Sequence, residues 1–370
     1  MSGLLGESPT IVLAPDKFKG TMTAGEVISA IEPVIAERWP GAHVLRVPMA
    51  DGGDGTLDAV LARGFDRRQC SAVDGLHRPV TAPFAMRADT VVLELAAICG
   101  LAVTGQRNVE QASSLGLGMA ARAAVDAGAR HVLIGLGGSA SVDGGLGFLL
   151  GLGLQAWDDG GAPVEPGLAG LARVRRIDAA GIPEAVRACT WQFLLDVENP
   201  LTGPRGAAAV FGPQKGLADA DIPWADAALA HWAELLGAAQ LAGDPGMGAA
   251  GGIALAARAV LGAEAEPGAP WIARLVGLAD AVATSSLVIT GEGAFDEQSL
   301  SGKAPAEVIR IARELGVTVR VLAGFVGIAE PRWRAMGVDQ VVSLSDVAGS
   351  ADEAMSRPAF WAAQAVPALL

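Results

Sequence analysis

The stretch 11-IVLAPDKFKGTMTAGEVISAIEPVIAERWPGAHVLRVPMADGGDGT-56 decides the fold class. The apolar run 11–14 predicts a strand, and the motif 23-TAGE-26 has the form of a capping box that opens a helix. Apolar residues then recur at helical spacing, with a kink expected at Pro33, and 42–49 predicts a second strand that leads into another helix. This alternation of strand and helix is typical of a parallel sheet covered by helices.

The middle of the chain follows a different pattern. Short predicted strands near 69–73, 79–86 and 90–95 indicate an antiparallel meander, with a turn signal at Asp74-Gly75. Further expected elements are the helix 114–127 and the strands 131–136 and 191–195. The stretch from 155 to 190 is rich in glycine and proline and gives no clear pattern.

From residue 270 the alternation of helices and strands returns. The expected elements are helix 271–282, strand 287–290, a long polar loop, helix 304–315, and strands 318–323 and 340–344. We therefore predict a two-domain α/β protein in which both chain ends form one parallel-sheet domain. The first predicted domain is Rossmann- or flavodoxin-like and consists of residues 1–64 and 281–370, with 112–150 as a candidate addition. The second is an inserted mixed α/β domain of residues 65–280.

Composition and charge exclude some classes of binding partner. With 51% hydrophobic residues in 370, the chain can bury a core, and a formal charge of −13 argues against a nucleic-acid or anionic-membrane partner. We expect small-molecule substrates and a monomer or homodimer. No membrane span or signal peptide is visible, and the cysteines at 70, 99 and 189 fit free thiols, so the cytoplasm is the expected compartment.

Lysine is scarce in this chain. Among 27 basic residues the lysines are Lys17, Lys19, Lys215 and Lys303, and each lies in a segment punctuated by glycine or proline. Codon bias toward arginine explains this distribution without any function. The functional explanation is that a compact ammonium serves where a point charge meets a phosphate or carboxylate.

Polar residues follow five of the predicted strands. In open α/β sheets the ligand crevice lies outside the carboxyl ends of the strands, so these residues are site candidates. They are, in strand order, Asp16, Lys17 and Lys19; Asp51 and Asp54; Gly137, Gly138, Ser139, Ser141 and Asp143; Asp196, Glu198 and Asn199; and Glu292, Asp296, Ser299 and Lys303.

The turn 135-GLGGSASVDGG-145 is the best candidate for a phosphate cradle. Its glycines permit close backbone approach, successive N–H groups can form an anion nest, and a helix N-terminus follows. The alternative is a tight turn that only packs on its neighbours. The loop 51-DGGDG-55 resembles a cation-binding loop but lacks the spacing of an EF-hand.

Together these groups favour phosphoryl transfer. Carboxylates can hold Mg²⁺, lysines can neutralise phosphate oxygens and glycine loops can wrap a polyphosphate, and this chemistry consists mainly of positioning and electrostatics. The chain has no Walker A motif, no kinase H-R-D segment and no G-x-S-x-G elbow. Its four histidines are scattered, which disfavours a zinc site or a Ser-His triad.

The chain resembles the type-1 glycerate kinase family across essentially its whole length. The motifs that carry the resemblance are APDKFKGTMTA (14–24), PMADGGDGTLDA (48–59), IGLGGSASVDGGLG (134–147), DVENPLTGPRGAAAVFGPQKG (196–216), PGMGAAGG (245–252) and ITGEGAFDEQSLSGKAP (289–305). The resemblance implies ATP- and Mg²⁺-dependent phosphorylation of D-glycerate to a phosphoglycerate. It also implies an active site in the cleft between two α/β domains, and a product that is more often 2- than 3-phosphoglycerate.

Within this assignment the residue roles are hypotheses. Asp196 is favoured as the base, or as the organiser of Mg²⁺, for the acceptor hydroxyl. Asp16, Asp51, Asp54 and Asp143 compete for the metal, and Lys17, Lys19 and Lys303 are candidates for contact with phosphate or the glycerate carboxylate. The remaining candidates for substrate or nucleotide binding are Gly137, Gly138, Ser139, Ser141, Glu292, Asp296 and Ser299. Helix capping is the alternative role for the aspartates and serines.

Two other functions stay open at this point. The GLGGSAS turn and the GEGAFD segment also suggest a sugar kinase of the ribokinase or GHMP type. A two-domain solute-binding or regulatory protein that closes on a small acid is the non-enzymatic alternative. Turnover of ATP with glycerate would separate all three.

Overall fold

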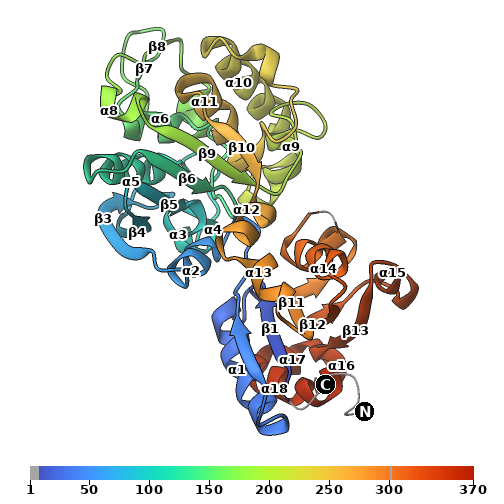
Figure 1. Ribbon diagram of the computed structural model, residues 1–370. Helices are drawn as coiled ribbons and strands as arrows, with labels where there is room; N and C mark the ends of the chain where they lie inside the picture. The colour runs from blue at the N-terminus through green and yellow to red at the C-terminus, as the bar shows by residue number, and fades with distance from the viewer. Residues whose placement is uncertain (1–7, 301) are drawn as a thin grey trace. The chain divides into compact units, whose positions relative to one another are not determined.

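The computed structural model describes residues 8–300 and 302–370 and divides into two compact units (Figure 1). The first unit contains the described part of Met1–Asp51 together with Asp58–Arg63 and Pro267–Leu370. The second contains Gly52–Leu57 and Gly64–Glu266. Both ends of the chain therefore belong to the first unit. The segment 112–150 lies in the second unit, and residues 267–280 lie in the first.

The first unit is built on a five-stranded parallel sheet in the order β13-β12-β11-β1-β2. Its strands are β1 (Thr10–Pro15), β2 (His43–Arg46), β11 (Leu287–Phe295), β12 (Thr318–Val326) and β13 (Val338–Ser343). Alternate strand residues such as Leu13 and Ile289 pack with α1 (Ala24–Arg38) and α18 (Pro358–Leu369), and α14 (Ala304–Glu314) packs against β1, β11 and β12. The predicted α/β class is confirmed.

The helix α1 forms as its sequence predicts. Glu26 N donates to Thr23 Oγ1 at 3.2 Å and Thr23 N donates to the Glu26 carboxylate at 2.8 Å, which completes the predicted capping box. Ile28, Ile31 and Ile35 are buried on one face. The helix continues through Pro33 to Arg38, so this proline does not end it.

The second unit contains a six-stranded mixed sheet in the order β10-β9-β6-β5-β4-β3. The predicted antiparallel meander is present as β3 (Asp66–Val73), β4 (Pro79–Arg87) and β5 (Thr90–Glu94). From β5 the sheet continues in parallel through β6 (His131–Gly135) and β9 (Thr190–Leu195), and β10 (Glu264–Pro267) lies at the edge. The segment without a clear sequence pattern contains a small hairpin of β7 (Gln155–Trp157) and β8 (Arg176–Asp178).

Aromatic and small residues form the core of the second unit. Phe148 on α6 (Leu146–Leu152) lies edge-on to Trp191 and Phe193 of β9, with ring centroids 5.9 and 6.2 Å apart. At Gly118 of α5 (Leu115–Asp126) an added Cβ would lie 2.1 Å from the carbonyl oxygen of Phe148. Glycine at this position therefore permits α5 and α6 to pack closely.

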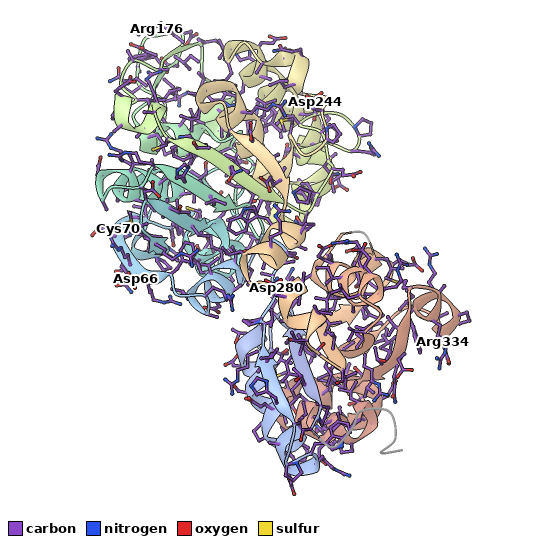
Figure 2. The ribbon with its side chains drawn as sticks, viewed as in Figure 1. Asp66, Cys70, Arg176, Asp244, Asp280 and Arg334 are labelled. Atoms are coloured by element: carbon purple, nitrogen blue, oxygen red, sulfur yellow. The ribbon has the colours of Figure 1, made fainter. Side chains whose placement is uncertain are left out.

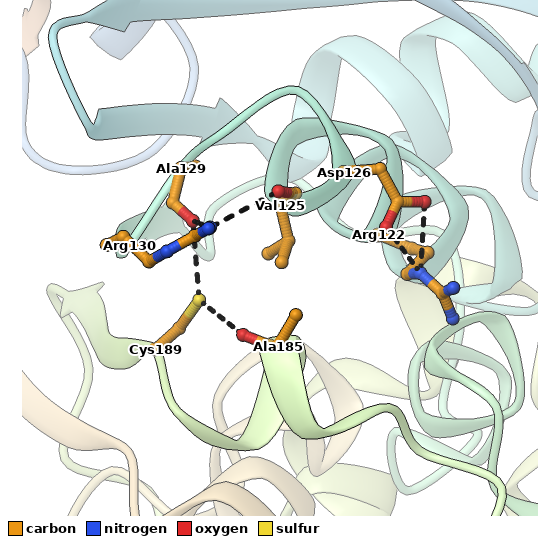
Figure 3. A network of polar contacts seen from close by, with 7 residues as sticks. All are labelled: Arg122, Val125, Asp126, Ala129, Arg130, Ala185 and Cys189. Carbon is orange, nitrogen blue, oxygen red and sulfur yellow. Dashed lines mark hydrogen bonds and ion pairs between the residues drawn. The ribbon is translucent and has the colours of Figure 1, made fainter.

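A polar network follows α5 and ties the start of β6 to the segment before β9 (Figure 3). The guanidinium of Arg130 donates to the carbonyl of Ala129 at 2.6 Å, and the Cys189 thiol donates to the same carbonyl at 3.5 Å. On the surface of α5, Arg122 pairs with Asp126 at 3.1 Å. Figure 2 labels Cys70 on β3 and Arg176 on β8. The Arg176 guanidinium lies over the ring of Trp157, 3.8 Å from its centroid.

The remaining helices are mostly short. They are α2 (Thr56–Leu61), α3 (Leu95–Cys99), α4 (Leu101–Thr104), α7 (Leu168–Leu171), α8 (Glu184–Arg187), α9 (Ala207–Phe211), α10 (Ile222–Leu235), α11 (Ile253–Leu261), α12 (Gly268–Leu275), α13 (Leu278–Ala283), α15 (Glu330–Ala335), α16 (Leu344–Ala348) and α17 (Ala351–Ser356). Five 3₁₀ turns complete the described structure: η1 (Pro213–Lys215), η2 (Asp219–Asp221), η3 (Ala239–Leu241), η4 (Ala249–Gly251) and η5 (Glu297–Leu300). Across the described part of the chain, no helix has the length and apolar character that crossing a membrane requires.

Two predicted elements differ from the structure. The helix expected over 271–282 is interrupted between α12 and α13, because Gly277 adopts a left-handed φ of 67° that ends one helix and begins the next. The strand expected to stop at Thr290 continues as β11 to Phe295. Glu292 therefore lies within a strand and not in the long polar loop that the sequence suggested.

Candidate functional site

The first unit gathers charged side chains where β1 and the loop after β2 end. We name Asp16, Lys17, Asp51, Glu292 and Lys303 the carboxylate–lysine cluster. The Lys17 ammonium lies 3.6 Å from Asp16 Oδ1 and 3.6 Å from Asp51 Oδ1. Asp16 N donates to the carbonyl of Gly291 at 2.8 Å, so the backbone of β11 fixes the start of this cluster.

Asp16 and Glu292 are neighbours across two paired strands. The last registered pair of β1 and β11 is Pro15 with Gly291, and both carboxylates come one residue later. Burial raises the pKa of Asp16 to about 7, with Lys17 opposing the shift and the charges of Asp51 and Glu292 adding to it. Burial likewise raises the pKa of Glu292 to about 7. The site can therefore hold or release protons close to neutral pH.

One carboxylate oxygen in this cluster has no hydrogen-bond partner within the described chain. Oε1 of Glu292 is buried, and within residues 8–300 and 302–370 it shares this condition only with Thr104 Oγ1. A buried acceptor without a donor is unfavourable by about 1–3 kcal/mol, so such atoms commonly mark a place for water, a metal ion or a ligand. Glu292 lies beside the carboxyl end of β1, and strand ends of a parallel sheet are where ligands commonly bind.

The loop after β11 is held by its own polar side chains. Asp296 Oδ1 accepts from the N–H of Gln298 at 2.8 Å, and Ser299 Oγ accepts from the N–H of Asp296 at 2.9 Å. Ser299 also donates to the carbonyl of Ala294 at 3.1 Å. Asp296 thus bonds to the backbone at the start of η5, and Ser299 bonds back to the end of β11, while a ligand contact of either residue stays a prediction.

Lys303 is the N-cap residue of α14 and acts electrostatically on Glu292. The N-terminus of an α-helix already carries a partial positive charge, so a lysine there adds charge of the same sign. A bound anion would stabilise both. Lys303 therefore remains a strong candidate for phosphate contact.

The segment that carries Lys17 and Lys19 is anchored by the residue between them. Phe18 is buried, and its N–H donates to the carbonyl of Met22 at 2.8 Å while Met22 N donates back at 3.0 Å. This small bridge leaves Lys17 half-buried beside the carboxylates and Lys19 exposed. The two lysines thus have different environments.

In the second unit the two glycine motifs lie against each other. We name residues 135–147 the glycine-rich turn. A Cβ added at Gly137 would lie 2.5 Å from Gly53 Cα and 3.5 Å from Asp54 N, and one added at Gly135 would lie 2.3 Å from the carbonyl oxygen of Gly52. Glycines therefore permit this contact, which places the exposed Asp54 next to the turn.

The turn presents backbone donors to its surroundings. Between Gly137 and Ala140, the carbonyl of Gly138 accepts from Leu101 N at 3.0 Å, and Ala140 N donates to the carbonyl of Cys99 at 3.1 Å. The N–H groups of Gly137, Gly138 and Ser139 have no acceptor in the described chain. Gly137 is half-buried and Gly138 is exposed, so this stretch is accessible to an anion.

Asp143 organises the turn from inside. It is fully buried, and its oxygens accept from Ser114 N and Oγ at 2.8 Å each, from Gly147 N at 3.1 Å, and from Ser141 Oγ and Gly145 N at 3.2 Å each. The structure gives this carboxylate an internal role. Its assignment to a metal ion stays a prediction.

Sequence reasoning left Lys215 out of the proposed site. Its ammonium donates to Ser139 Oγ at 2.6 Å and to the carbonyl of Ser141 at 2.7 Å, so both predicted serines have internal partners. The scarcity of lysine singled it out with the other three lysines, but it follows no predicted strand and so received no role in the site.

Asp196 follows β9 directly and is exposed, as expected for a residue at the carboxyl end of a parallel strand.

A ready-made metal centre is absent from the residues that the structure describes. Within them no three histidine, cysteine, aspartate or glutamate side chains come together as a metal-binding group. Mg²⁺ in phosphoryl-transfer enzymes is usually bound by one or two carboxylates together with substrate phosphates. Asp51 and Asp54 therefore remain metal candidates with this simpler donor set.

Comparisons with known proteins agree over the whole chain. A family model described as the glycerate kinase family matches residues 11–369. The chain is 36% identical over 356 residues to the glycerate 2-kinase of Escherichia coli K12, covering 93% of this chain and 92% of that protein. It is 35% identical over 357 residues to the glycerate kinase of Bacillus subtilis 168, covering 94% of each.

The fold is also similar to a solved structure. A crystal structure of a protein assigned as glycerate kinase 2 from Salmonella typhimurium LT2 superimposes with a TM-score of 0.80 at 35% identity. The match covers 98% of both chains. Sequence and fold therefore point to the same group of proteins.

Proposed function

Because this chain belongs to the glycerate kinase family and is a kinase that phosphorylates glycerate, we propose that it transfers the terminal phosphoryl group of ATP to D-glycerate, giving 2-phosphoglycerate. A whole-chain match to this family removes the support for the sugar-kinase and solute-binding alternatives. The name of the Escherichia coli relative, glycerate 2-kinase, supports the position of transfer.

The observation that carries the chemistry is the carboxylate–lysine cluster. Lys17 between two carboxylates, and Lys303 at the positive end of α14, offer charge to an anionic substrate in a protein of net charge −13. Such cations can neutralise phosphate or the glycerate carboxylate. Lys19, which is exposed in the same segment, is a further candidate for this contact.

We assign the glycine-rich turn to the phosphates of the nucleotide. Its donors at Gly137, Gly138 and Ser139 have no acceptor in the described chain, which supports this role. Backbone N–H groups in a glycine-rich turn are well suited to phosphate oxygens because no side chain blocks their approach. Ser141 and Asp143 stabilise the conformation of the turn from within, because Asp143 accepts from the Ser141 hydroxyl and from Gly145 N.

The residues present also fit Mg²⁺. The buried Oε1 of Glu292 without a donor, and the carboxylates of Asp16 and Asp51 beside it, are hard oxygen ligands of the kind Mg²⁺ takes, and Asp54 is the candidate in the second unit. When bound, the ion would neutralise charge on the transferring phosphoryl group. Lys17 keeps Asp16 and Asp51 close together for this purpose.

The hydroxyl of D-glycerate that receives the phosphoryl group must lose a proton. We propose that the carboxylate of Asp196 accepts this proton. An exposed carboxylate directly after β9 is accessible to the hydroxyl of a bound substrate, as a general base must be. The three cysteines are free thiols, which supports a reducing compartment such as the cytoplasm.

A coupled assay of ADP release tests the proposed function. The purified chain is given ATP and Mg²⁺ with D-glycerate, and in parallel with L-glycerate, other hydroxy acids, ribose or galactose. We expect rapid ADP release with D-glycerate and little with the sugars. Equal or faster release with a sugar, or none with D-glycerate, would contradict the proposal.

A further inference from the structure

We propose that Lys215 is a positioning residue for the glycine-rich turn, and that its ammonium holds Ser139 and Ser141 so that the preceding N–H groups face a phosphate. The inference rests on the proposed role of the turn in nucleotide binding. Lys215 ends η1, and Gly216 follows it with a left-handed φ of 99°. The side chain reaches the turn from a segment more than seventy residues further along the chain.

The contacts define where Lys215 acts. It donates to the hydroxyl of Ser139 at 2.6 Å and to the carbonyl of Ser141 at 2.7 Å, on either side of Ala140. Ala140 N is itself bonded to the carbonyl of Cys99 at 3.1 Å. Three consecutive residues are therefore held in place directly after the two glycines whose N–H groups lack acceptors.

The environment of Lys215 is unusual for a residue that only fills space. Lys215 is 3% exposed, and its two acceptors, the Ser139 hydroxyl and the Ser141 carbonyl, are neutral oxygens. Burying an ammonium without a directly bonded carboxylate is unfavourable, and a hydrophobic residue would fill the same volume more favourably. The charge and its directed N–H groups must therefore serve a purpose beyond packing.

The electrostatics around Lys215 are simple. Burial lowers its pKa to about 7, and the attraction of Asp143 opposes this shift. Arg107 packs against Gly216, the residue after Lys215. A Cβ added at Gly216 would lie 3.2 Å from the Cβ of Arg107. The turn is thus held by two buried side chains, Asp143 through its carboxyl oxygens and Lys215 through its terminal nitrogen.

The kinetic test separates positioning from general stability. Lys215→Met keeps the length of the side chain and removes every donor. We expect the KM for ATP to rise by about 10- to 100-fold, because misplacement of a binding group by about 1 Å has effects of this size. The KM for D-glycerate should change far less.

A matched control and a second variant complete the experiment. Arg122→Met removes a positive charge from the surface of α5 in the same unit and should leave both KM values unchanged. Ser139→Ala removes one acceptor of Lys215 while the lysine side chain stays in place, and it should also raise the KM for ATP. Because both changes break the same hydrogen bond, the double variant should be less impaired than the product of the single effects.

The outcomes distinguish this inference from the proposed function. If the wild-type chain turns over ATP with D-glycerate but Lys215→Met and Ser139→Ala both keep a normal KM for ATP, the positioning role is wrong and the proposed function stands. Equal increases in both KM values would likewise reject it. If Lys215→Met does not fold, Ser139→Ala and its KM for ATP decide alone. A wild-type chain without ATP turnover refutes the proposed function first.

Discussion

Burial of Glu292 makes the stability of the fold depend on pH. Its folded pKa of about 7 lies above the ordinary value of 4.5, so between these two pH values the folded chain binds more protons than the unfolded chain. Stability from this residue is therefore greatest below pH 4.5 and is lost as the pH rises toward 7. Ionised Glu292 destabilises the fold at neutral and alkaline pH.

Glu292→Gln tests this sign. Glutamine keeps the shape and cannot ionise, so we expect the Tm to rise at pH 8 relative to wild type and to change little at pH 5. Turnover should fall, because an NH₂ group replaces one carboxylate oxygen and the side chain can no longer carry the negative charge that a metal ion requires. Thermal unfolding at both pH values is the measurement. An equal Tm change at pH 5 and pH 8 would contradict this account, because it would mean that Glu292 has the same pKa in the folded and the unfolded chain.

Asp196→Asn tests the proposed proton acceptor. Because the side chain is exposed, we expect little change in Tm, while kcat falls by about 10²- to 10⁴-fold, the usual contribution of a positioned general base. Steady-state kinetics and thermal unfolding are measured on the same preparation. Asp126→Asn on the surface of α5 is the matched control and should keep wild-type kinetics. Near-normal turnover of Asp196→Asn would remove this residue from the chemistry.

At this scale the sequence identified residue types better than their contacts. Asp16 and Lys17 were predicted because they follow a strand, and strand ends meet at one edge of a parallel sheet. Ser139 was predicted to touch a ligand, yet its hydroxyl accepts from Lys215, which lies 76 positions further along the chain. No local sequence pattern can reveal a contact between residues this far apart in the chain. Only the folded chain decides whether a hydroxyl faces a ligand or a buried lysine.

At the scale of elements, the glycine-rich turn depends on a backbone contact. Gly137→Ala would place a methyl group 2.5 Å from Gly53 Cα, and neither backbone can yield as a flexible side chain would. We expect a loss of about 1–3 kcal/mol in the free energy of unfolding and a higher KM for ATP. Urea unfolding and kinetics provide the measurements.

Gly243→Ala is the control for this prediction. No atom lies within 4 Å of a Cβ added at Gly243, and its φ is not in the left-handed region. This variant should therefore retain the stability and the KM of wild type. If Gly137→Ala behaves like this control, the two glycine motifs do not pack as closely as the structure indicates.

Most of the long elements could be predicted because their signals are local. The capping box at Thr23 and the spacing of buried isoleucines specify α1 without reference to the rest of the chain. The extension of β11 could not be predicted, since Gly291 and Glu292 carry no strand signal of their own. These residues join the strand because β12 pairs with them, Glu292 beside Ala323 and Ala294 beside Phe325. The short hairpin of β7 and β8 is likewise defined by pairing.

For the whole molecule, the sequence predicted an α/β fold in which both chain ends share one parallel sheet. The order β13-β12-β11-β1-β2 bears this out, with strands from both ends side by side. The pattern of alternating elements could not give the exact division of the chain, because residues 52–57 join the second unit and residues 267–280 join the first by packing. Membership of the glycerate kinase family then supplies the reaction class.

The position of phosphoryl transfer is the central claim that a single spectrum can test. The product formed from ATP and D-glycerate is examined by proton-coupled phosphorus NMR. A phosphate on the C2 oxygen couples to the single proton of that carbon and gives a doublet, which is the result we predict. A triplet from the two protons at C3 would contradict the assignment of this chain as a 2-kinase, and an unchanged ATP spectrum would contradict the reaction itself.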